Sequence, residues 1–180
     1  MIVAASALMF ASCGNANKSA AAPVESTQVN EDAKPVVYMT KEITPEALVK
    51  IYDALGVTPS GKVAVKISTG EPGGHNFLQP SLIKDLVTKV NGTIVECNTA
   101  YKGPRYETET HMKVFEDHGF AAIAPVDLLD GYGEVKIPVK DTTYIKYNLV
   151  GENMLNYDWM VNLAHFKGHA MGRSEEHTSE

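Results

Sequence analysis

The stretch KVAVKISTGEPGGHNFLQPSLIKDLVTKVNGTIVECN, residues 62–98, decides the fold. It opens with a strand-like apolar segment at 62–68 and ends with a second one at 92–98. Between them, Pro80 suits the first position of a helix over 80–90. A strand, a helix and a strand in succession favour a parallel sheet that is covered by helices.

The same alternation continues on both sides of this stretch. Thr44 suits the N-cap of a helix over 44–56, Pro45 its first position and Gly56 its end. The other expected elements are a strand at 35–39, a helix at 107–119, a strand at 120–125 and a core strand at 157–169. Two short strands are also expected at 133–139 and 142–150, either on an edge of the sheet or in an excursion from it. The sequence therefore predicts an α/β fold with a mostly parallel sheet flanked by helices.

Length and charge narrow the class of protein. The 180 residues suit a single domain, and an apolar share of 44% is enough for a hydrophobic core. The net charge of −6 argues against a nucleic-acid partner, which would require a basic face.

The N-terminal segment differs in character from the rest. Residues 1–13 form an apolar run that is too short to span a membrane and suits a signal peptide. Ala11 and Ser12 before Cys13 resemble a bacterial lipobox, although Phe10 stands where leucine is usual. We expect lipidation at Cys13 and a disordered tether over 14–35, which would anchor the protein in the cell envelope, facing the periplasm or the exterior. The alternative is an apolar N-terminal extension.

Three polar loops follow predicted strands, at 68–76, 96–111 and 165–172. Ligands of parallel α/β sheets bind outside the carboxyl ends of the strands, where these loops would converge. In the first loop, Glu71 and His75 suit an acid, a base or a metal ligand, and the alternative is a solvated turn. In the second, Arg105 suits a clamp for a carboxylate or phosphate.

Other residues of these loops have competing interpretations. Cys97 is more typical of a small buried side chain than of a nucleophile. His118 suits a packed or capping position near the end of its helix. In the third loop, Lys167 and His169 suit donors to an anionic ligand, and we assign no metal ligand there.

Taken together, VAVKISTGEPGGHNFLQPSLIKDLV, IVECNTAYKGPRYETETHMKVFEDHGF and DWMVNLAHFKGHAMG resemble the bacterial "domain of unknown function 362" family over residues 36–172. The resemblance implies a link to iron–sulfur proteins, some with a ferredoxin-type 4Fe-4S module. Family members continue after the K-x-H element with a glycine-rich stretch, from which this chain departs after Gly172. We therefore expect a partial domain, incomplete at its C-terminal side. Residues 173–180, RSEEHTSE, read like a translated sequencing-library adapter, which we expect to be an artefact.

These observations lead to one leading hypothesis and two alternatives. The leading one is a lipid-anchored fragment, redox-linked and iron–sulfur-associated in its full-length form, that binds a small anionic ligand or cofactor and meets a redox partner protein. The alternatives are a non-enzymatic lipoprotein that binds a ligand or partner, and a metal-dependent hydrolase. The expected catalytic residues are Glu71, His111 and His169, and the expected ligand-binding residues are Asn76, Asn98, Thr99, Arg105 and Lys167.

Overall fold

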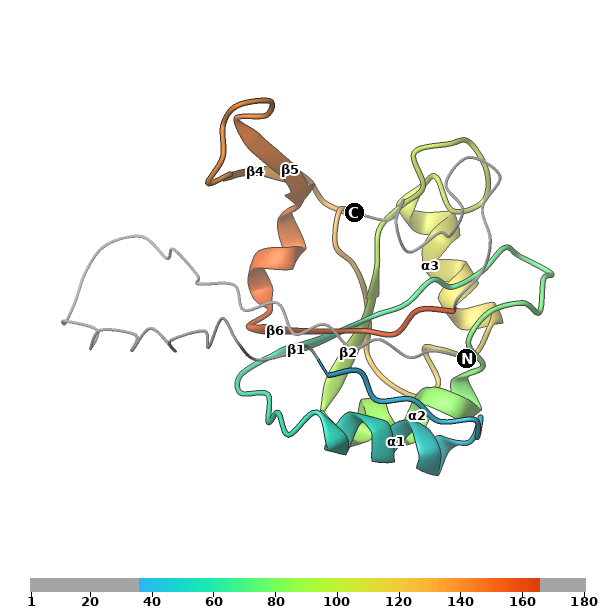
Figure 1. Ribbon diagram of the computed structural model, residues 1–180. Coiled ribbons are helices and arrows are strands. Elements are labelled where there is room, and N and C mark those ends of the chain that lie inside the picture. The colour runs from blue at the N-terminus through green and yellow to red at the C-terminus, as the bar shows by residue number, and fades with distance from the viewer. Residues whose placement is uncertain (1–35, 166–180) are drawn as a thin grey trace.

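The computed structural model describes residues 36–165 and shows a parallel sheet with helices packed against it (Figure 1). Its strands lie in the order β3–β2–β1–β6, and every neighbouring pair is parallel. Their bounds are β1 Val63–Lys66, β2 Gly92–Glu96, β3 Val126–Leu128 and β6 Trp159–Asn162. The predicted α/β fold class is confirmed.

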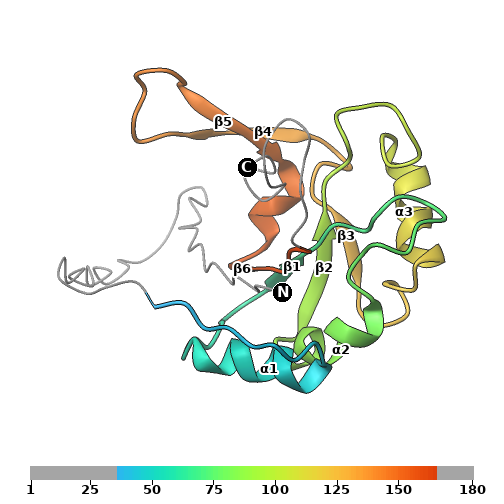
Figure 2. The same cartoon turned by 45° about the vertical axis from the view of Figure 1, so that its right-hand side comes forward.

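The three α-helices of the described chain are α1 Pro45–Ala54, α2 Pro80–Lys89 and α3 Thr108–Asp117. Thr44 caps α1, because its side-chain oxygen accepts a hydrogen bond of 3.1 Å from the amide of Ala47. Figures 1 and 2 show α1 and α2 side by side, with α3 apart from them. The helices expected at 44–56, 80–90 and 107–119 are therefore all present.

The main hydrophobic core lies between the sheet and these helices. Val65 and Ile94 point into it from the strands, and Ile83 and Phe115 meet them from α2 and α3. Ala64, on the opposite face of β1, belongs to a smaller cluster under the segment that leads to β6. The central strands β1 and β2 thus alternate their side chains between two covered faces, as expected for a buried parallel sheet.

The two short strands expected between 133 and 150 form a separate antiparallel hairpin. They are β4, Glu134–Pro138, and β5, Tyr147–Gly151, and a short 3₁₀-helix, η1 Glu152–Asn156, leads back towards β6. Figure 1 shows this hairpin standing away from the main sheet. A Cβ at Gly151 would lie 2.3 Å from the carbonyl of Leu129, so glycine permits the hairpin to approach the end of β3.

Two predicted strands are wrong. Residues 36–39 are exposed and unpaired, so no strand begins there. Residues 120–124 form turns instead of a strand, because their amides donate locally, for example from Phe120 to the carbonyl of Phe115 at 2.9 Å. Phe120 is fully buried in the core, whereas Ala121 and Ala122 are exposed, and the strand begins only at Val126.

Several predictions fall on residues 1–35 and 166–180, which lie outside the described residues. They are the signal segment with Cys13, the tether over 14–35, Lys167, His169 and the tail over 173–180. Between residues 36 and 165, none of the helices combines the length and the apolar character that crossing a bilayer demands.

Replacing Phe120 by alanine should destabilise the domain strongly, because its ring is fully buried against Phe77 and Phe115. We expect the free energy of unfolding to fall by about 3–5 kcal/mol in denaturant titrations. Tyr144→Ala is the matched control, since that ring is 95% exposed. Equal losses for the two variants would contradict this description of the core.

Candidate functional site

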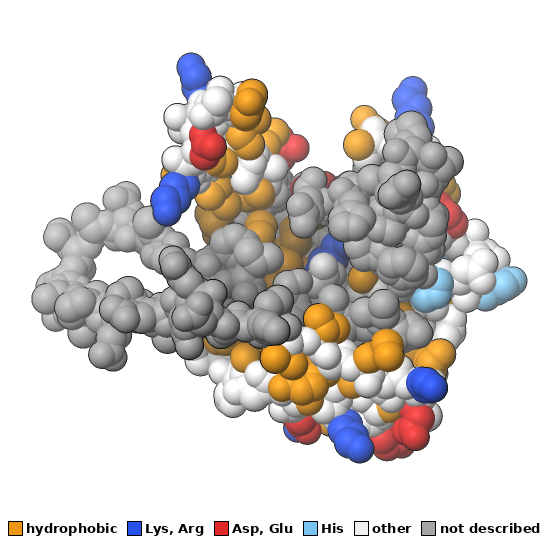
Figure 3. Space-filling model, in the orientation of Figure 1, with side chains coloured by type: hydrophobic (Ala, Val, Ile, Leu, Met, Phe, Trp, Pro, Cys, Tyr) orange, Lys and Arg blue, Asp and Glu red, His pale blue; other side chains and the backbone are white. Residues whose placement is uncertain are grey.

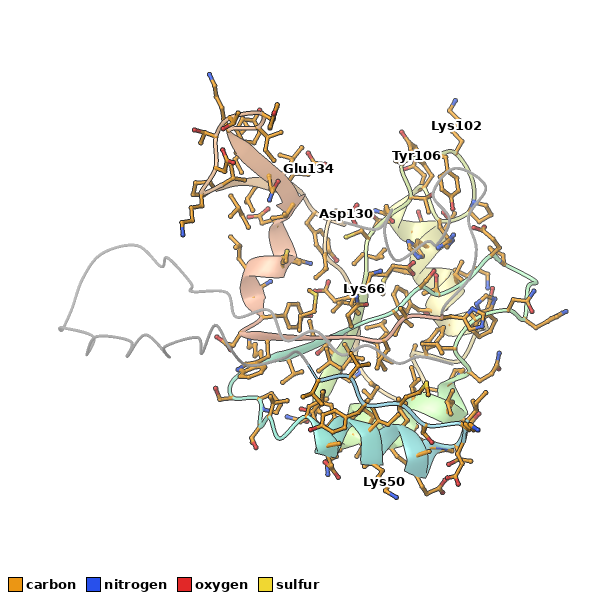
Figure 4. All side chains as sticks on the ribbon, viewed as in Figure 1. Lys50, Lys66, Lys102, Tyr106, Asp130 and Glu134 are labelled. Carbon is orange, nitrogen blue, oxygen red and sulfur yellow. The ribbon has the colours of Figure 1, made fainter. Side chains whose placement is uncertain are left out.

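The carboxyl ends of the strands meet at one edge of the sheet. Lys66, the last residue of β1, pairs in register with Val95 of β2 and Asn162 of β6. Figure 3 shows the surface hollowed between the β4–β5 hairpin and the side that carries α3, and Figure 4 shows Lys66 at the base of that hollow. The loops 68–76 and 96–111 both start at this edge, and their side chains meet.

The two loops contact each other around a buried carboxylate, that of Glu96 at the end of β2. One oxygen, Oε2, accepts a hydrogen bond of 2.9 Å from the amide of Thr69 and lies 3.0 Å from Nε2 of His111. The other oxygen, Oε1, accepts a bond of 3.1 Å from Nη1 of Arg105. Glu96 therefore joins both loops to helix α3.

His111 is fully buried beside this carboxylate. Its Nδ1 lies 3.1 Å from Oδ1 of Asn98, whose amide nitrogen donates to the hydroxyl of Thr108 at 3.0 Å. That hydroxyl in turn donates to the carbonyl of Gly131 at 3.3 Å, so the amide oxygen of Asn98 must face the imidazole. Nδ1 of His111 therefore donates, and Nε2 faces Glu96.

The contacts around Glu96 keep this side chain ionised. Burial acts to raise the pKa of Glu96, but the hydrogen bonds from His111 and Thr69 outweigh it and leave this pKa lowered. Glu96 is therefore a carboxylate at neutral pH.

Arg105 links this buried pair to the surface of the loops. Its side chain is only 9% exposed, and Nη2 contacts both the carboxylate of Glu71 and the hydroxyl of Tyr101, the latter at 3.0 Å. Burial acts to lower the pKa of Arg105, but Glu71 and Glu96 reverse this effect and raise it. The guanidinium is therefore charged and held between two carboxylates.

The structure places the other predicted residues as follows. Asn76 is exposed at the far end of the first loop. The hydroxyl of Thr99 donates to the carbonyl of Tyr101 at 2.9 Å and so shapes the second loop, whose tip carries Lys102 and Tyr106 (Figure 4). Glu71, Asn98, Arg105 and His111 thus belong to one network, whereas Asn76 stands apart.

His118 is packed, as its position near the helix end predicts. Its ring stacks on Phe77 with 4.1 Å between the ring centroids, and Nδ1 donates to the carbonyl of Thr69 at 2.7 Å. Cys97 is exposed, which corrects the expectation of a buried side chain. Its surroundings nevertheless desolvate the thiol and, together with Asp130, raise the pKa of Cys97 to about 11. The thiol is protonated at neutral pH and is a poor nucleophile there.

The residues present do not fit an iron–sulfur cluster. A 4Fe-4S cluster takes four cysteine thiolates, whereas this sequence contains two cysteines, Cys13 and Cys97. In the part of the chain between 36 and 165, no group of three or more His, Cys, Asp or Glu side chains is placed to hold a metal ion.

Sequence reasoning missed Glu96 and Thr69, whose hydrogen bonds join the other residues of the network. The available signal was a charge inside the apolar run TIVEC, because a glutamate at the end of a buried strand requires partners. Asp130 was also missed. It accepts a bond of 2.9 Å from the amide of Asn98, which holds the start of the second loop.

Replacing Glu96 by glutamine should lower the free energy of unfolding at pH 7 by about 3–5 kcal/mol, because Arg105 loses a buried counter-charge and His111 loses the carboxylate beside its Nε2. The lowered pKa of Glu96 gives the sign of the pH dependence. Its stabilisation is present above the unfolded pKa of about 4.3 and is lost as the pH falls through the folded pKa.

Denaturant titrations between pH 7 and pH 3 measure this effect. The difference between the wild type and Glu96→Gln should shrink as the pH falls. Glu42→Gln is the control, because Glu42 is exposed and should give no such difference at any pH. A deficit in Glu96→Gln that stays constant down to pH 3 would show that Glu96 is not an ionised partner.

Comparison with known proteins identifies a family. The family model described as Domain of unknown function (DUF362) matches residues 63–174. The match includes the loops and helix α3 that build the Glu96 network. No curated protein and no solved structure is significantly similar to the chain. The chain therefore belongs to the family described as Domain of unknown function (DUF362).

Proposed function

We propose that this domain binds a small anionic ligand at the carboxyl edge of its sheet, with Arg105 as the charged anchor. The observation that carries the proposal is Nε of Arg105, a buried donor without a hydrogen-bond partner among the described residues. Leaving such a donor unpaired costs about 1–3 kcal/mol, and an unpaired one requires an explanation. A bound anion supplies that explanation.

The surroundings of Arg105 suit such a ligand. The site lies where parallel α/β sheets place their ligands, at the ends of β1 and β2. Tyr101 adds a hydroxyl beside the guanidinium, and Thr99 shapes the loop that presents both. Lys167 remains a predicted second cation for this ligand.

In this proposal His111 acts on the ligand only through its neighbours. The imidazole is fully buried and is surrounded by Glu96, Thr69 and Asn98. Its Nε2 lies 3.0 Å from Oε2 of Glu96, and the other oxygen of Glu96 accepts from Arg105, so the imidazole helps to position the guanidinium. This arrangement favours ligand binding as the role of the described residues, and Glu71 and His169 remain the predicted groups for proton transfer.

We also propose that the protein is lipid-anchored and redox-linked in the cell. The lipobox-like residues before Cys13 support the anchor, and the family resemblance supports an association with iron–sulfur proteins. Because this chain lacks the cysteines for a 4Fe-4S cluster, a partner protein or another segment would have to hold it. Iron and acid-labile sulfide in the protein isolated with its partners would support the link, and their absence would remove it.

Arg105→Lys should weaken the binding of acetate or inorganic phosphate by about 10–100-fold, because lysine keeps the charge but loses the planar fork of donors. Isothermal titration measures the affinity, and circular dichroism verifies the fold. Lysine still offers Glu96 a cation, so this variant avoids an unpaired buried carboxylate.

The matched control is Lys102→Ala, which removes an exposed cation from the same loop (Figure 4). Its affinity should stay within about 2-fold of the wild type, since an exposed charge is screened. Wild-type affinity in Arg105→Lys together with weakened binding in Lys102→Ala would place the anion at the loop tip and reject the proposal.

Lipidation makes a separate prediction about Cys13. Protein expressed from its gene in a bacterial host should carry a diacylglycerol mass on Cys13 and fractionate with membranes. Cys13→Ser should lose both the mass and the membrane association, while Cys97→Ser should retain them. Mass spectrometry that finds an unmodified Cys13 in the mature protein would rule out the anchor.

A further inference from the structure

Building on the proposed anion site, we infer that the carboxylate of Glu71 occupies the position beside Arg105 that a ligand carboxylate would take. The site would then take a carboxylate, and Glu71 would be a latch that the ligand displaces. This inference rests on the proposed function, and it adds the class of the ligand and the step that opens the site.

The first argument is the geometry of the guanidinium. The Nε–H of an arginine and one hydrogen of Nη2 point to the same side, where they form a fork that matches the two oxygens of a carboxylate. In Arg105, Glu71 contacts Nη2 through Oε1 alone, and Nε stays without a partner among the described residues. A ligand carboxylate that used both donors would gain a hydrogen bond that Glu71 does not make.

The second argument is the contrast between the two partners of Arg105. The side chain of Glu96 is 9% exposed, whereas that of Glu71 is 58% exposed. Glu96 is fixed on a strand, but Glu71 lies on a loop between Gly70 and Gly73, which have φ values of +80° and +74°. Glu71 can therefore turn into solvent while Glu96 keeps the guanidinium in place.

The third argument is charge. Replacing the carboxylate of Glu71 by a ligand carboxylate leaves the charge around Arg105 unchanged. A phosphate dianion would instead add negative charge near Glu96, whose Oε1 lies 3.1 Å from Nη1 of the same guanidinium. Like charges in a site of low polarity repel strongly, so the geometry points to a carboxylate as the ligand class.

The hydroxyl of Tyr101 can form hydrogen bonds both when Glu71 is bound to Arg105 and when a ligand has displaced it. In the latched state it accepts from Nη2 of Arg105 at 3.0 Å and donates to Oε1 of Glu71 at 3.3 Å. A ligand oxygen on Nη2 would meet the same hydroxyl proton. The exchange therefore retains this hydrogen bond as well as the charge balance.

The test is a titration of Glu71→Gln with acetate and with inorganic phosphate. If the latched state holds about nine-tenths of the molecules or more, removing the carboxylate should tighten acetate binding by about 10-fold or more. Glu107→Gln, an equal loss of charge at an exposed position near Arg105, should change the affinity by less than about 2-fold.

The NMR signal of the Nε–H group of Arg105 reports directly on whether the ligand uses this donor. The chain has two arginines, Arg105 and Arg173, so a ¹⁵N-labelled sample gives two Nε–H signals. The signal of Arg105 is assigned by its loss in Arg105→Lys. Acetate should shift it downfield and slow its exchange with water, because Nε then donates to the ligand. An unchanged signal at saturating acetate would show that the fork is not used.

The outcomes separate the latch from the proposed function. Equal acetate affinity in the wild type and Glu71→Gln would overturn the latch while the anion site stands. Tighter binding of phosphate than of acetate by Glu71→Gln would overturn the carboxylate class. If neither the wild type nor Glu71→Gln bound either anion, the proposed function itself would be wrong.

Discussion

The carboxylate of Glu96, buried at the end of a central strand, is the constraint on which the rest of the site depends. A charge in such a place is tolerated only when its partners replace the water that it has lost. Those partners come from three segments, as Thr69 follows β1, Arg105 lies in the loop after β2, and His111 lies on α3. The ionised state of one side chain thus determines how two loops and a helix meet.

The side chains of the network become more exposed from its centre to the surface, and only the outermost one can be replaced by a ligand. His111 is fully buried, Glu96 and Arg105 are nearly so, and Glu71 is largely exposed. Breaking an inner ion pair leaves a buried charge and costs about 3–5 kcal/mol, whereas an exposed pair contributes about 0–1 kcal/mol. The same arginine therefore has one partner that maintains the fold and one that it can give up at little cost.

The sequence was most informative where local chemistry alone sets the structure. Thr44 and Pro45 mark the start of α1, and the alternation of strands and helices predicted the parallel sheet, because both signals act over a few residues. The segment 120–125 was misread because Phe120 is buried in the core, and burial does not distinguish a strand from a turn. The strand expected at 35–39 failed for a related reason, since an apolar run needs a neighbour with which to pair.

The candidate site was predictable in outline only. Convergence of two loops followed from the parallel sheet, and it brought Glu71 and Arg105 into one cluster. Glu96 and Thr69 could not be found in the same way, because their role depends on contacts with His111 across 15 and 42 residues of chain. Cys97 was expected to be buried, yet it lies exposed where β2 gives way to its loop.

Thr69 explains why the loop after β1 can be rigid at its base and free at its tip. Its amide donates to Glu96, its hydroxyl meets Nε2 of His111 at 3.1 Å, and its carbonyl accepts from His118. All the polar atoms of this residue are therefore held. Directly after it, Gly70 adopts φ of +80°, and any Cβ there would lie 2.8 Å from Phe77. The boundary between the fixed and the exchangeable part of the site thus falls at Gly70, one residue before the carboxylate that we infer a ligand displaces.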